Sequence, residues 1–131
     1  EKDFRMWVSF SQNEMAKIYY YVTSSKQEPV RDFIDSLEKN NKQRLFRIFE
    51  HFKSYSVVVA IPHIKKLSGT RLWEIKLIGK NSIRVIYAVV FKNDALILLG
   101  FVKKAQKTPL KYIGTALKRL KDWEARHGID R

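Results

Sequence analysis

The sequence contains no cysteine, which excludes disulfide bonds and thiolate chemistry. It has no apolar run long enough to span a bilayer and no signal-peptide pattern, so we expect a cytoplasmic protein without a membrane partner. The three histidines, His51, His63 and His127, are far apart and lack ligand-like spacing, so we expect no metal and no other cofactor. A glycine-rich phosphate loop is also missing, which argues against an NTPase.

Acidic residues are scarce in the second half of the chain. Residues 51–121 contain 15 basic residues but only two acidic ones, Glu74 and Asp94, whereas residues 1–50 contain nine basic and eight acidic residues. The whole chain carries a formal net charge of +13. Such an uneven distribution predicts a polyanionic partner, which is RNA, DNA or an acidic protein. The alternative is that the charge only keeps the protein soluble.

A length of 131 residues with 45% hydrophobic residues predicts a single domain, residues 1–131, with one packed core. Because residue 1 is not Met, we expect residues 1–15 to be partly tag or poorly ordered, with Met6 and Met15 as alternative natural starts.

Hydrophobic spacing in the first half predicts a strand and a helical hairpin. Residues 17–23 are rich in β-branched and aromatic types, as in a strand. After Pro29, apolar residues recur at helical spacing until Asn40-Asn41, which predicts a first helix. The same spacing from Leu45 to Phe52 predicts a second helix.

Residues 72–78 and 83–91 predict two strands, because apolar side chains alternate along them, and the continuous apolar run of residues 95–102 predicts a third strand that is covered on both faces. Two short turns separate these segments, so the three strands are expected to form an antiparallel meander. Thr108-Pro109 is typical of a helix cap and first turn, which predicts a final helix. The expected class is therefore α+β, in the order β-α-α-β-β-β-α, with helices on one face of a mostly antiparallel sheet. The other face is then expected to stay polar and to gather basic residues.

Cations of this meander are candidates for RNA chemistry. Lys76 and Arg84 are expected on neighbouring strands, and Lys103, Lys104 and Lys107 follow the last strand. Cleavage by the RNA 2′-OH needs a base, an acid and cations that stabilise the charge on the phosphorane. Crowded lysines lower the pKa of one another, so one of them could transfer a proton near neutral pH. The alternative is that these solvated residues only steer RNA.

Four blocks carry a family resemblance: EPVRDFIDSL, PHIKKLSGTRLWEIKL, IRVIY and LLGFVKKAQKTP. They strongly resemble the HigB-like, phage-derived Gp-type branch of the RelE/ParE toxin superfamily, over roughly residues 17–126. The resemblance implies a RelE-like fold and a type II toxin, which is a metal-free, ribosome-dependent mRNA endonuclease that inhibits translation. It also implies a helix-turn-helix (HigA-like) antitoxin, in a higher oligomer bound to operator DNA through the antitoxin.

By position, the resemblance implies three catalytic residues, Lys76, Arg84 and Lys104, with Lys104 as the phosphate-stabilising cation. The expected RNA-binding residues are Lys65, Lys66, Arg71, Trp73, Lys103 and Lys107. Trp73 is either a core residue or a base-stacking platform. Glu74 either forms a salt bridge with Arg84 or Lys76, or acts as a base.

The sequence departs from the family pattern at three positions. Lys76 replaces the commoner Arg, Ile83 stands where Tyr often precedes Arg84, and Ala105 replaces Thr. Tyr87 and Tyr112 are candidates for the late catalytic Tyr of RelE-type enzymes, although neither aligns cleanly. Two other functions remain open, a ParE-like gyrase inhibitor and a non-catalytic nucleic-acid-binding module.

Overall fold

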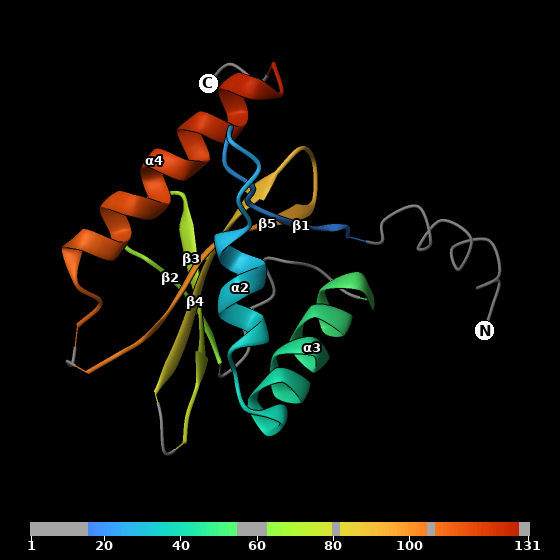
Figure 1. Cartoon of the computed structure of the whole chain (residues 1–131), viewed down its shortest axis with the longest axis vertical. Coiled ribbons are helices and arrows are strands. Elements are labelled where there is room, and N and C mark those ends of the chain that lie inside the picture. Colours follow the sequence, from blue (N-terminus) through green and yellow to red (C-terminus); the bar gives the residue numbers. More distant parts are fainter. Residues whose placement is uncertain (1–15, 55–62, 80–81, 105–106, 129–131) are drawn as a thin grey trace, which may run out of the picture.

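The computed structural model describes residues 16–54, 63–79, 82–104 and 107–128 (Figure 1). In chain order, the elements are β1 (Ile18–Tyr20), α2 (Pro29–Asp35), α3 (Lys39–Ser54), β2 (Ile64–Lys66), β3 (Leu72–Leu77), β4 (Ile83–Val90), β5 (Asp94–Val102) and α4 (Leu110–Arg126). The α+β class is therefore confirmed. The expectations for residues 1–15 and for Ala105 lie outside the described residues.

The five strands form one sheet in the order β1-β5-β4-β3-β2. The β1–β5 pair is parallel and the other three pairs are antiparallel, so the predicted meander of β3, β4 and β5 is confirmed. The predicted element order is wrong by one strand, because Ile64–Lys66 pairs with β3 as β2. Three residues are too few for alternation to reveal a strand in the sequence.

Helices cover both faces of the sheet, so the expectation of helices on one face only is wrong. Two adjacent residues of β1 show this, because consecutive side chains of a strand point to opposite faces. The ring centroids of Tyr20 and Phe49 of α3 are 6.3 Å apart. The ring centroids of Tyr19 and Trp123 of α4 are 6.0 Å apart. The helical hairpin of α2 and α3 occupies one face, and α4 buries its apolar stripe on the other (Figure 1).

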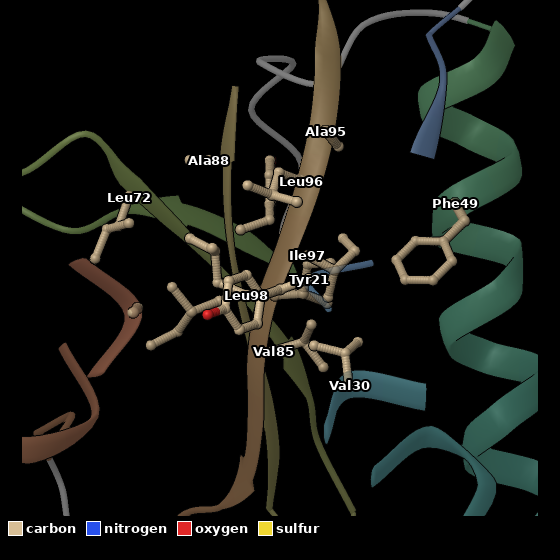
Figure 2. Close-up of a cluster of buried hydrophobic side chains, with 14 of the residues drawn as sticks. Tyr21, Val30, Phe49, Leu72, Val85, Ala88, Ala95, Leu96, Ile97 and Leu98 are labelled. Atoms are coloured by element: carbon tan, nitrogen blue, oxygen red, sulfur yellow. The ribbon is translucent and has the colours of Figure 1, made fainter. Parts of the chain in front are cut away.

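The core lies on both sides of β5, in which residues 95–98 are fully buried. Figure 2 shows Val30 and Phe49 on the side of the helical hairpin and Leu72 on the opposite side of β5. A continuous apolar run is what a strand covered on both faces requires, as the sequence predicted.

A β-bulge interrupts the pairing of β4 with β5. Ile86 pairs with Leu99 and the next residue, Tyr87, pairs with Ile97, so Leu98 has no partner in β4. The Leu98 carbonyl instead accepts a hydrogen bond of 2.7 Å from Arg119 Nη1 of α4. The extra residue changes which side chains of β5 face α4 from this point to the end of the strand.

Candidate functional site

Five charged residues gather on the α4 face of the sheet, at the end that holds the β3–β4 turn. Lys65 pairs with Glu74 across β2 and β3, and Lys76 pairs with Arg84 across β3 and β4. The Lys103 amide donates to the Ser82 carbonyl at 2.7 Å, which continues the β4–β5 ladder beyond Val102. We call Lys65, Lys76, Arg84 and Lys103 the cation cluster.

Glu74 lies buried within the cation cluster. Its Oε1 is 3.6 Å from Arg84 Nε, and only 1% of its side chain and 8% of that of Arg84 are exposed. Thr108 Oγ1 donates a 2.5 Å hydrogen bond to Glu74 Oε2, and Arg84 Nη1 donates to Ser82 Oγ at 2.6 Å. The salt-bridge interpretation of Glu74 is confirmed.

The roles of Ser82 and Thr108 were not predicted from the sequence. Thr108 was expected to cap the last helix, but Pro109 is the N-cap residue and no side chain caps α4. The Thr108 hydroxyl bonds Glu74 instead, so this contact fixes the segment before α4 to the site. The Thr108-Pro109 pair predicts the start of a helix, but it does not predict a hydrogen bond to a residue as distant in the chain as Glu74.

Lys103 is the most buried lysine of the cation cluster, with 9% of its surface exposed. Burial lowers the pKa of Lys103 below the ordinary lysine value, and the charges of Arg84, Lys65 and Lys76 lower it further. Glu74 opposes this effect. One cation of the cluster therefore releases its proton more readily than a free lysine does.

Two other predicted lysines lie outside the cluster. Lys104 is exposed and lines a shallow cavity of about 280 Å³ beside Pro109, Lys111 and Tyr112. Lys107 is exposed in the segment that leads to α4. The structure thus brings Lys76 and Arg84 together, with Lys104 on a neighbouring surface.

The remaining predicted RNA contacts have different surroundings. Lys66 is exposed and pairs in register with Trp73, on the opposite face of the sheet from Glu74. Trp73 is half-buried, and its ring stacks 6.4 Å from that of Tyr87. Arg71 donates two hydrogen bonds, of 3.0 and 2.7 Å, to the Glu124 carboxylate. Their RNA contacts stay predictions.

The two candidate tyrosines differ in access to the site. Tyr87 is fully buried on the hairpin face, 5.0 Å from Phe52, and burial raises the pKa of its hydroxyl. Tyr112 stacks at 4.0 Å on Phe101, which is the partner of Arg84 in β5. Tyr112 is therefore the candidate on the α4 face.

The described part of the chain holds neither a candidate metal site nor a membrane-spanning helix. Residues 16–54, 63–79, 82–104 and 107–128 contain no group of three or more His, Cys, Asp or Glu side chains that could hold a metal ion. Within the same ranges, every helix is too short or too polar to cross a bilayer.

Comparison with known proteins gives the family. The profile described as "Phage derived protein Gp49-like (DUF891)" matches residues 32–121, which include the whole cation cluster. No curated protein matches the chain. Membership of a toxin–antitoxin family implies an antitoxin partner. The chain belongs to the Gp49-like family of phage-derived proteins, which is associated with RelE/HigB-type toxins of toxin–antitoxin systems.

Proposed function

We propose that this protein is an endoribonuclease toxin that cleaves mRNA on the ribosome and is neutralised by a helix-turn-helix antitoxin. The observation that carries the proposal is the cation cluster, in which four cations surround one buried carboxylate. A net positive, partly desolvated surface is suited to a phosphodiester, since electrostatic interactions are stronger away from bulk water.

The reaction that fits this site is attack of an RNA 2′-oxygen on the adjacent phosphorus. The new bond joins the 2′-oxygen to phosphorus, and the bond from phosphorus to the 5′-oxygen breaks. A base accepts the 2′ proton and an acid protonates the 5′-oxygen. The products are a 2′,3′-cyclic phosphate and a 5′-hydroxyl, and the negative charge on the phosphorane is what the cations stabilise.

Burial and charge suggest a division of roles among the cations. Arg84 is held by Glu74 and Ser82, so its guanidinium is fixed where it can bind the scissile phosphate. Lys76 lies beside it in register and adds a second positive charge. Lys103, whose pKa is lowered, is the proton carrier of the cluster. Lys104 contacts the neighbouring phosphate from its exposed position.

The antitoxin would neutralise this site by covering it with acidic or apolar segments. A net charge of +13 makes such an association fast and sensitive to salt. The same antitoxin would carry the toxin to operator DNA.

The test is cleavage mapping of an mRNA in a purified translation reaction. We expect the wild-type protein to cut within translated codons and Lys76→Ala, Lys103→Ala and Lys104→Ala to cut at least about 100-fold more slowly. Lys92→Ala is the matched control, because this exposed lysine lies in the turn between β4 and β5, at the opposite end of the sheet from the β3–β4 turn. Ribosome binding of every variant is measured in parallel.

Three outcomes contradict the proposal. Equal loss of cleavage in Lys92→Ala and Lys76→Ala would mean that total charge, rather than the cluster, matters. Salt-dependent RNA binding without cleavage would indicate a nucleic-acid-binding module. Growth arrest with intact mRNA would exclude the nuclease and make gyrase the next target to assay.

A further inference from the structure

A positively charged pocket lies on the face of the sheet opposite the cation cluster. Its volume is about 200 Å³, and its lining residues are Arg44, Arg47, Ile48, His63 and Leu77. We call it the arginine pocket. Ile48 and Leu77 are buried and form its apolar floor, whereas Arg47 and His63 are exposed at its rim. The pocket therefore combines an apolar base with two guanidinium groups.

Few carboxylates of the described chain lie where they could balance the positive charge of the arginine pocket. Arg47 forms no ion pair with any carboxylate among the residues that the structure describes. The polar partner found for Arg44 in this part of the chain is the Asn41 side-chain oxygen, 3.3 Å from Nη1. Residues 51–73 and 75–93 contain no Asp or Glu. An anion from outside the chain is the natural ligand of such a pocket.

The arginine pocket and the cation cluster occupy the same end of the sheet. Leu77 pairs with Ile83 on one face, directly beside the Lys76–Arg84 pair on the other. The Arg44 guanidinium also lies at the turn after β3, because a Cβ added to Gly79 would sit 3.5 Å from Arg44 Nη1. The neighbouring residues Lys76 and Leu77 of β3 thus belong to the two positively charged sites on opposite faces of the sheet.

We propose that the arginine pocket binds a backbone phosphate of the RNA strand that occupies the cation cluster, where this strand passes around the end of the sheet. The proposal rests on the proposed function, since RNA in the cluster brings the strand to this edge. Two guanidinium forks match the geometry of phosphate oxygens, and the apolar floor suits a ribose or base. Continuity with the cluster favours RNA over an acidic protein segment.

The experiment measures binding of uncleavable 2′-O-methyl RNA by fluorescence anisotropy at several salt concentrations. Two oligonucleotides share one sequence, a short one that fills only the cation cluster and a longer one that reaches beyond it. The test variant is the Arg44→Ala/Arg47→Ala pair. The matched control is the Lys118→Ala/Lys121→Ala pair, which removes two exposed charges at the same helical spacing from α4. Thermal unfolding verifies that both variants are folded.

We expect the arginine variant to bind the long RNA more weakly and its logarithmic salt slope to fall by about 0.7, the value for one lost phosphate contact on a single strand. Binding of the short RNA should stay unchanged, and Arg44→Lys/Arg47→Lys should restore part of the affinity. The proposal is overturned if the two alanine pairs behave alike, or if the arginine pair weakens only antitoxin binding. Because the RNA is uncleavable, failure of this proposal is distinct from failure of the nuclease, which would appear as uncut mRNA with the wild-type protein.

Discussion

Glu74 and Arg84 lie on adjacent strands with Oε1 and Nε 3.6 Å apart, and almost none of either side chain is exposed. A buried ion pair adds little net stability, since desolvation of both charges offsets their attraction, but loss of one partner leaves an uncompensated charge. The pair also lies between the sheet and the segment that begins α4, because Thr108 bonds the same carboxylate. Glu74 therefore both positions Arg84 in the cation cluster and holds the segment before α4 against the sheet.

Glu74→Ala is expected to lower the free energy of unfolding by about 3–5 kcal/mol, because it leaves the Arg84 charge buried among other cations. Urea denaturation measures the loss. The control is Glu28→Ala, which breaks the exposed pair with Arg31 and should cost less than about 1 kcal/mol. Similar costs for the two variants would refute the view that Glu74 balances the cluster.

Gly100→Ala is expected to lower the free energy of unfolding by about 1–3 kcal/mol, because an added Cβ would overlap the ring of Phe33 of α2. Thermal unfolding provides the measurement, and Phe33→Leu in the same chain should recover part of the loss. Gly114→Ala is the matched control, since nothing lies within 4 Å of its added Cβ. Because Gly114 lies within α4, Gly114→Ala should instead raise the free energy of unfolding by about 0.5–1 kcal/mol. A neutral Gly100→Ala would mean that α2 does not pack tightly on β5.

The sequence predicts β3 because alternation is strong where one face of a strand is charged and the other apolar. Trp73, Ile75 and Leu77 alternate with Glu74 and Lys76, and this pattern gives both β3 and its faces. The position of α4 was not predictable in the same way. Its amphipathic stripe shows that it packs on an apolar surface, but the pattern does not distinguish the two faces of the sheet.

The cation cluster is predictable only up to the bulge in β5. Alternation places Lys76 and Arg84 on one face, and the structure agrees. Which of Lys103 and Lys104 joins them depends on the extra residue, Leu98, within a run in which every side chain is apolar. Such a run has no alternation in which a shift could be seen, so the sequence could not assign the buried lysine.

Arg71→Ala is expected to lower the free energy of unfolding by about 1–2 kcal/mol, because it removes two charged hydrogen bonds to Glu124. The expected loss of unfolding free energy is modest because 39% of the Arg71 side chain is exposed, so solvent partly screens its ion pair with Glu124. Arg71 is also an expected RNA-binding residue, so RNA affinity, measured well below the unfolding temperature, should fall more than in Lys118→Ala. An equal fall would show that Arg71 only pairs with Glu124.

Lys103→Met is expected to stabilise the fold at neutral pH while it abolishes the proposed cleavage, because the buried charge is unfavourable for folding but useful at the site. The pKa of Lys103 is lower in the folded state, so the unfolded chain binds more protons between that pKa and the ordinary lysine value of 10.5. The stability of the wild-type protein therefore gains from Lys103 as pH rises through this interval.

The advantage of Lys103→Met should accordingly be largest below the folded pKa of Lys103 and shrink as pH approaches 10.5. Urea denaturation of both proteins across this range measures the difference. Lys66→Met, at an exposed position of β2, is the control and should show a small difference that is constant with pH. A Lys103→Met variant that is less stable than the wild type at neutral pH would contradict the argument, since Lys103 would then be stabilised by Glu74 more than it is penalised by burial and by the other cations.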